Sequence, residues 1–119
     1  MELTGKRIAV LVDNVYQEME VWYPIYRLQE AGAEVVTVGA VAGQTYTSKL
    51  GYPCKAEKSY DAIQASEFDG VVVPGGYAPD IMRRSKKLLQ LTREIYEADK
   101  PVAFICHAGW VPISAGIVR

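Results

Sequence analysis

Short apolar runs alternate with amphipathic segments along this chain, and this alternation constrains the fold more than any other feature. The apolar runs cover residues 7–12, 34–38, 68–73 and 102–105. Runs of this length are typical of strands buried on both faces of a parallel sheet. Between them, two longer segments carry apolar side chains at helical spacing, residues 18–31 and 85–98. Strand and helix in alternation predict a doubly wound α/β domain, with a parallel sheet and flanking helices.

Capping residues, glycines and prolines refine this pattern. Ser85 is the expected N-terminal cap of the second helix, and Gly32 the C-terminal cap of the first. Pro24 lies inside the first helix, where its missing N–H leaves the carbonyl of Glu20 without a partner, so we expect an irregular first turn. Glycine and proline interrupt residues 43–57, which predicts a small hairpin or an irregular excursion.

Length and composition exclude several classes of function. The 119 residues fit one domain, over residues 1–119, and the formal net charge of -1 argues against a nucleic-acid partner. No apolar run reaches the ~20 residues that span a bilayer, and the first residues do not resemble a signal peptide, so we expect no membrane partner and a cytoplasmic location. Cys54 and Cys106 should then stay reduced. Two cysteines and one histidine are too few for a closed zinc site, and we predict no metal and no cofactor.

Three segments follow the carboxyl ends of predicted strands, which is where doubly wound sheets bind ligands. They are residues 13–20, residues 74–80, and the pair Cys106-His107. This convergence indicates a site at one end of the sheet.

Cys106 is the candidate nucleophile. It separates an apolar strand from the start of a helix, where the helix dipole favours the thiolate, the nucleophilic form. The layout is that of a nucleophile elbow, a tight turn that lifts the side chain out of the sheet. The simpler alternative is a buried cysteine that acts as a small hydrophobic residue.

His107 could be a general base that activates the thiol or a water, or it could be a bystander that offers only its backbone N–H. The N–H groups of Gly75, Gly76 and His107 could form an oxyanion hole; the alternative for the glycines is an ordinary turn.

Three carboxylates are candidates for the site. Either Glu18 or Glu20 could reach the cysteine, or both could be exposed acids that the helix dipole favours. Asp80 could orient the histidine, and a helix cap or surface acid is its simpler interpretation.

The residues also carry a family resemblance. Four segments resemble the PfpI family of intracellular cysteine proteases and deglycases, which groups with the Parkinson's-associated deglycases and the class I glutamine amidotransferases. They lie at residues 5–11, 18–32, 68–80 and 100–110, and they include Pro-Gly-Gly-Tyr-Ala-Pro-Asp and Phe-Ile-Cys-His-Ala-Gly-Trp. The resemblance implies a flavodoxin-like, class I glutamine amidotransferase-like fold.

The same resemblance implies roles for single residues. It makes Cys106 the nucleophile, His107 its partner and Glu20 the carboxyl beside the sulfur, with an oxyanion hole from the amides of Gly75, Gly76 and His107. It also implies that Asp80 completes a triad across a subunit interface, and therefore a homo-oligomer such as a dimer or a hexamer built of dimers.

The chain departs from the family pattern at three points. Gln17 stands where the family often has another acid, so the role of that acid is lost here. Pro112 stands one turn after the cysteine, and the family continues beyond residue 119, so we expect a domain that is incomplete at its C-terminus, with an uncovered sheet face or edge.

The expected function is cysteine-dependent hydrolysis of a peptide, or deglycase or glyoxalase action on a small carbonyl substrate derived from methylglyoxal. The alternative is a redox-sensing stress protein or chaperone, in which Cys106 is oxidised reversibly.

Overall fold

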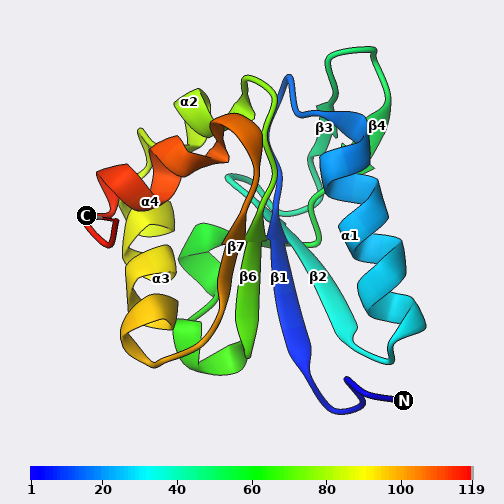
Figure 1. The fold of residues 1–119 in the computed structure, drawn as a ribbon. Coiled ribbons are helices and arrows are strands. Elements are labelled where there is room, and N and C mark those ends of the chain that lie inside the picture. Colours follow the sequence, from blue (N-terminus) through cyan, green and yellow to red (C-terminus); the bar gives the residue numbers. More distant parts are fainter. Residues whose placement is uncertain (119) are drawn as a thin grey trace.

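A five-stranded parallel sheet forms the centre of the protein, which we describe from a computed structural model over residues 1–118 (Figure 1). Every pairing within this sheet is parallel. In spatial order the strands are β5 (Lys58–Ser59), β2 (Glu34–Gly39), β1 (Arg7–Leu11), β6 (Gly70–Val73) and β7 (Val102–Phe104). The expected α/β sheet is therefore confirmed, and each of the four predicted strands is present.

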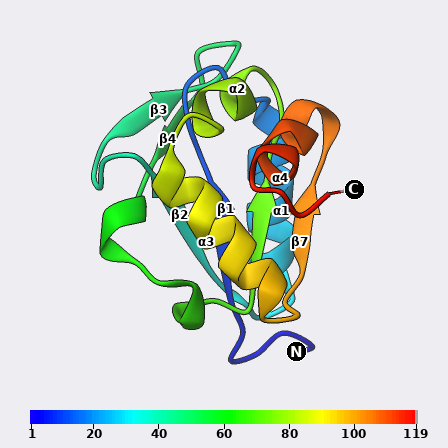
Figure 2. The ribbon, with the colours of Figure 1, turned by 90° about the vertical axis from the view of Figure 1, so that its left-hand side faces the viewer.

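Helices cover both faces of the sheet because the strand order reverses direction. From β1 the chain crosses to β2 on one side, whereas from β6 it crosses to β7 on the other. Parallel crossovers are right-handed, so the two crossover helices lie on opposite faces. These helices are α1 (Glu18–Glu30) and α3 (Lys86–Glu97), and Figure 2 shows α3 in front of the sheet with α1 behind it. The point of reversal lies between β1 and β6.

Helix α1 is defined by its two ends. The side chain of Gln17 caps its first turn, and at its end Gly32 adopts a φ of 100°. There the N–H of Ala33 donates to the carbonyl of Leu28, and that of Gly32 to the carbonyl of Gln29, which is a Schellman motif. Gly32 is thus part of the helix ending, as expected. The expected irregular first turn is absent, because α1 runs unbroken through Pro24.

The second half of the chain contains elements that the periodicity missed. Residues 43–57 do form a hairpin, of strands β3 (Thr45–Thr47) and β4 (Pro53–Lys55). The two-residue strand β5 and three single-turn or short helices after it are too short to show a period. The helices are η1 (Tyr60–Ala62), η2 (Ala65–Glu67) and α2 (Ala78–Met82). After β7 come η3 (Cys106–Gly109) and α4 (Trp110–Ser114), where the sequence predicted a helix opening.

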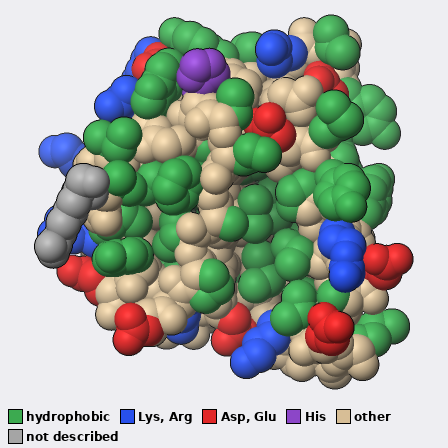
Figure 3. Space-filling model, in the orientation of Figure 1, with side chains coloured by type: hydrophobic (Ala, Val, Ile, Leu, Met, Phe, Trp, Pro, Cys, Tyr) green, Lys and Arg blue, Asp and Glu red, His purple; other side chains and the backbone are tan. Residues whose placement is uncertain are grey.

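Strand β7 leaves apolar surface open. It is an edge strand within residues 1–118, and its end exposes Phe104 at 46% and Ile105 at 52%. Together with Tyr23 and Leu28 of α1, these side chains line a shallow apolar groove of about 350 Å³. Hydrophobic side chains accordingly run down the middle of the molecule in Figure 3. No helix in the described part of the chain is long and apolar enough to cross a membrane.

The core contains one poorly satisfied polar group. Tyr60 is 7% exposed, burial raises the pKa of its phenol, and its hydroxyl has no hydrogen-bond partner among residues 1–118. Tyr46 is also buried, at 2% exposed, but its hydroxyl accepts a hydrogen bond of 3.1 Å from the N–H of Val41. The two tyrosines therefore form a matched pair, one with and one without a partner.

We predict that Tyr60→Phe raises the free energy of unfolding by about 1 kcal/mol, because it removes a buried hydroxyl that has lost water without gaining a bond. Tyr46→Phe should lower it by a similar amount, because it leaves the N–H of Val41 without its acceptor. Urea unfolding of both variants measures the difference. A destabilised Tyr60→Phe protein would show that the hydroxyl has a bonding partner after all.

Candidate functional site

The candidate site lies at the carboxyl ends of β1, β6 and β7, where the strand order reverses. Two backbone hydrogen bonds join the loop after β1 to the loop after β6. The N–H of Tyr77 donates to the carbonyl of Val15 at 2.9 Å, and that of Gln17 to the carbonyl of Gly75 at 3.4 Å. Val15 adopts a φ of 62°, which is rare for a β-branched residue, and both of its backbone groups are bonded. The first two predicted segments therefore meet, as sequence position suggested.

Gly76 allows this meeting. Its φ is 80°, and a methyl group at its Cα would stand 2.6 Å from both the amide nitrogen of Gln17 and the carbonyl oxygen of Val15. Real side-chain carbons do not approach backbone atoms this closely. Gly76 is therefore required both for the positive φ of the turn and for the close approach of the two loops.

Cys106 stands two residues after the end of β7. It is exposed, and its φ of 61° is the left-handed conformation that non-glycine residues rarely adopt. Strain of this kind is typical of functional sites, and it lifts the side chain out of the strand, as in a nucleophile elbow. Cys54 differs in each respect, because it is buried in the hairpin and burial raises the pKa of its thiol to about 11. The simple alternative for Cys106, a buried hydrophobic residue, is wrong.

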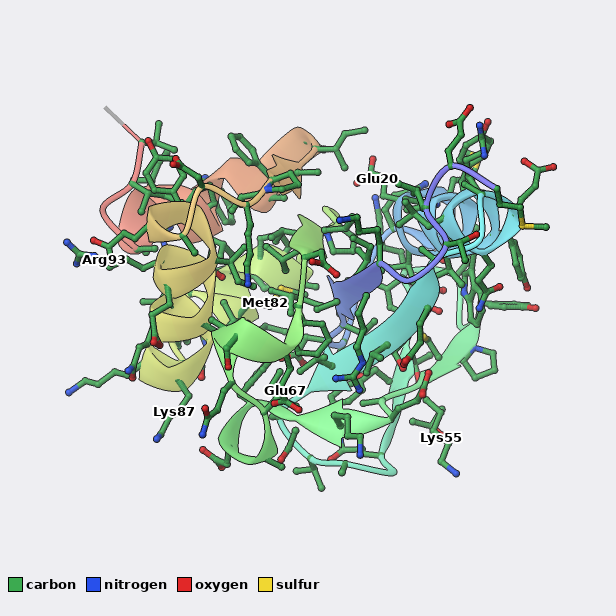
Figure 4. The ribbon with its side chains drawn as sticks, turned by 90° about the horizontal axis from the view of Figure 1, so that it is seen from below. Glu20, Lys55, Glu67, Met82, Lys87 and Arg93 are labelled. Carbon is green, nitrogen blue, oxygen red and sulfur yellow. The ribbon has the colours of Figure 1, made fainter. Side chains whose placement is uncertain are left out.

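Glu20 is the carboxylate that lies beside Cys106. Its Oε1 accepts a hydrogen bond of 2.9 Å from the N–H of Gly75. A methyl group on Gly75 would touch that oxygen and also come within 2.9 Å of the Cβ of Cys106, so the carboxylate and the cysteine flank one glycine. In Figure 4, Glu20 extends from α1 toward the segment that follows β7.

Glu18, the other candidate, faces away from the cysteine. Its carboxylate accepts a hydrogen bond of 2.8 Å from the N–H of Leu50, in the hairpin loop. The pKa of Glu18 is lowered mainly by a hydrogen bond from the Ser48 hydroxyl, and further by the hydrogen bond from the N–H of Leu50. The choice between the two acids, which sequence reasoning left open and the resemblance decided for Glu20, agrees with this geometry.

The three proposed oxyanion donors are not equivalent. The N–H of Gly75 is already bonded to Glu20, so it is not free for a substrate oxygen. The backbone N–H groups of Gly76 and His107 have no acceptor within the described residues. Two of the three amides are therefore available, and the third holds the carboxylate in place.

The side chain of His107 is exposed and lies tilted against an aromatic ring. Its imidazole lies 5.1 Å from the ring centroid of Trp110, and the guanidinium of Arg83 lies 5.6 Å from that same indole. The purple side chain in Figure 3, the one histidine of the sequence, stands at the surface. The carboxylate of Asp80 is paired with Arg84 at 2.6 Å, and no hydrogen bond or ion pair joins it to His107 within the described residues. Within one chain, the acid that was expected to orient the histidine is thus engaged elsewhere.

Sequence reasoning missed Gln17. It was noted only as the loss of a family acid, yet its Oε1 accepts hydrogen bonds from the N–H groups of Met19 and Glu20 at 2.8 and 3.1 Å. Glutamine is not among the usual capping residues, so propensity gave no signal for this role. No group of three or more His, Cys, Asp and Glu side chains suited to a metal ion occurs within residues 1–118.

We predict that Gly76→Ala destabilises the protein far more than Gly43→Ala. Both glycines have a φ near 80°, but the space around Gly43 is empty to 4 Å. The Gly43 variant should therefore show only the backbone penalty of about 1 kcal/mol, whereas the Gly76 variant must also separate two loops. Thermal unfolding of the two variants makes the comparison. Equal losses would show that the loops do not depend on this contact.

Comparisons with known proteins identify the relatives of this chain. The model of the DJ-1/PfpI family matches residues 6–119. Deglycase PH1704 of Pyrococcus horikoshii is 38% identical over 113 residues, which are 95% of this chain and 68% of the relative. Protein/nucleic acid deglycase 2 of Escherichia coli is 36% identical over 116 residues, 97% of this chain and 67% of the relative.

A solved structure shows the same fold. It is the crystal structure of a two-domain protein from Anabaena variabilis that contains DJ-1/ThiJ/PfpI-like and ferritin-like domains. The TM-score is 0.93 at 36% identity, and the match covers 96% of this chain and 33% of that one. The chain spans about two thirds of the curated relatives named above. With the family model matching almost its whole length, this chain belongs to the DJ-1/PfpI family.

Proposed function

We propose that this protein is a cysteine-dependent hydrolase that acts on a carbonyl compound, of the deglycase or glyoxalase type or of the protease and amidase type. One observation carries the proposal. Cys106 is exposed in a strained turn at the end of β7, it and the carboxylate of Glu20 both lie against Gly75, and the N–H groups of Gly76 and His107 have no acceptor within the described residues. Nucleophile, carboxylate and oxyanion donors are the parts that acyl-transfer chemistry requires.

The first step is addition of the thiolate to the carbonyl carbon. The carbonyl oxygen gains the negative charge, and the N–H groups of Gly76 and His107 are the donors that would stabilise it. A site built on backbone amides needs no rearrangement when the charge develops, which is why such donors contribute a factor of ~100–1000 each.

The fate of the adduct depends on the substrate. From an amide, the adduct expels the amine, which takes a proton from His107 or Glu20, and water then hydrolyses the thioester to a carboxylic acid. From methylglyoxal, a proton moves from the aldehyde carbon to the neighbouring carbon, which gives a lactoyl thioester, and water releases lactate. The second route needs a base beside the sulfur, which is where Glu20 lies. The two curated relatives are both named deglycases, which favours the deglycase type over the protease and amidase type.

A location in the reducing cytoplasm is part of the proposal, because it keeps an exposed thiol such as Cys106 unmodified. Self-association is another part. Helix α1 exposes Met19, Tyr23 and Tyr26 on its outer side, and aromatic residues of this kind are enriched in subunit contacts. Asp80 would act on a partner's histidine only after release from Arg84.

A second function has its own support. An exposed thiol whose only fellow cysteine is buried forms no internal disulfide, and such a thiol suits a redox-sensing stress protein or chaperone. This alternative requires reversible oxidation of Cys106 without turnover.

We predict that Cys106→Ala lowers turnover of methylglyoxal, or of a fluorogenic peptide, by at least about 100-fold, because it removes the nucleophile. Cys54→Ala is the matched control and should keep the activity, since that thiol is buried in the hairpin. Lactate release and peptide fluorescence measure the two activities. The hydrolase proposal fails if the wild type turns over neither substrate while peroxide oxidises Cys106 selectively and reversibly; that result favours the redox function.

A further inference from the structure

Gln17 joins the two loops of the candidate site through its backbone, and its side chain caps the helix that carries Glu20. Its backbone N–H donates to the carbonyl of Gly75, and its backbone carbonyl accepts from the N–H of Glu20 at 3.2 Å. Its side-chain oxygen accepts from Met19 and, again, from Glu20. The N–H of Glu20 is therefore shared between two oxygens of one residue.

These bonds close a circuit around the carboxylate. The N–H of Gly75 donates to the side chain of Glu20, the N–H of Glu20 donates to Gln17, and the N–H of Gln17 donates back to the carbonyl of Gly75. Each of the three residues fixes the next. Glu20 is therefore held at two points, at its backbone N–H by Gln17 and at its carboxylate oxygen by the N–H of Gly75. Cys106 lies against the same glycine that receives it.

The chemical type of the cap matters here. Gln17 is half-buried and uncharged, and it supplies the two oxygens that orphan N–H groups at a helix start require without adding a second carboxylate. Two carboxylates at one end of a site repel each other, and the charge of each would depend on the other. With a neutral cap at position 17, no carboxylate of the cap competes with that of Glu20 beside Cys106.

We propose that Gln17 is a positioning residue, which holds Glu20 against Gly75 and thereby sets the reactivity of Cys106. The inference rests on the proposed function only in taking Cys106 as the reactive thiol. It assigns a role to a residue that the family pattern marks as a departure.

The test is the rate at which iodoacetamide alkylates Cys106, followed by mass spectrometry between pH 6 and pH 9. Cys54 adds little to this signal, because burial raises the pKa of its thiol to about 11. We expect Gln17→Ala to slow alkylation by roughly three- to tenfold, because the carboxylate of Glu20 would no longer be held beside the sulfur as the base that takes the thiol proton. Gln17→Ser, which restores a capping oxygen, should recover most of the rate.

Two comparisons separate positioning from a general loss of stability. Ser85 caps α3 in the same way, with its hydroxyl accepting from the N–H of Leu88 at 3.2 Å, and it takes no part in the site. Ser85→Ala should therefore lower the melting temperature without slowing alkylation. In a Glu20→Ala background, Gln17→Ala should have no further effect on the rate, because it acts through Glu20.

The inference is overturned if Gln17→Ala behaves as Ser85→Ala does, or if its effect adds to that of Glu20→Ala. Alkylation requires no turnover, so the outcome is independent of the substrate. A protein that turns over neither methylglyoxal nor peptide, but in which Gln17→Ala slows alkylation, contradicts the proposed function and supports the role of Gln17.

Discussion

The hydrogen bonds between the loop after β1 and the loop after β6 are the interaction on which the site depends. Parallel strands bring their carboxyl ends to one edge of the sheet. At this edge, however, the chain leaves β1 toward one face of the sheet and leaves β6 toward the other, so the two loops diverge. Backbone bonds from Tyr77 and Gln17 close that gap, and Gly76 permits the approach. Once the loops are joined, Glu20 on one and Gly75 on the other can bind each other.

Local strain and local electrostatics then act on the same few residues. Val15 and Cys106 both hold a left-handed backbone, which costs on the order of 1–2 kcal/mol per residue and which the rest of the fold must offset. At Cys106 the strain turns the side chain outward, and the same turn starts a helical segment in which the N–H of His107 has no acceptor among residues 1–118. One turn therefore presents the sulfur together with an N–H group that, under the proposed function, donates to the developing oxyanion.

The sequence supports prediction of the framework because the framework rests on periodicity. The apolar runs predicted strands β1, β2, β6 and β7, and the apolar stripes within residues 18–31 and 85–98 predicted α1 and α3. Strand β5 and helix α2 were missed, because two to five residues carry no readable period and their positions follow from packing. Pro24 misled in the opposite direction, since the surrounding fold keeps α1 unbroken despite the lost bond.

The site was only partly predictable for a related reason. The predicted strand ends located Cys106 and Gly75. The choice of Glu20 over Glu18 needed the family resemblance, because the two acids lie in one helical turn and differ only in the direction in which their side chains point. Neither the sequence pattern nor the resemblance indicated that Arg84 pairs with Asp80. Neither indicated that the N–H of Gly75 donates to Glu20, or that the side chain of Gln17 caps α1. Each of these is a contact of a side chain with one particular atom, and such contacts depend on the assembled fold.

The central claim is that the turn at Cys106 and the loop after β6 together present the sulfur and the two amides that receive the substrate oxygen. A crystal structure of the protein with a peptide aldehyde bound covalently tests it most directly, since a thiol adds to an aldehyde as it would to a substrate carbonyl. We expect a bond to the Sγ of Cys106 and the aldehyde-derived oxygen within hydrogen-bond distance of the N–H groups of Gly76 and His107. An adduct whose oxygen points into solvent, away from both amides, would contradict the account.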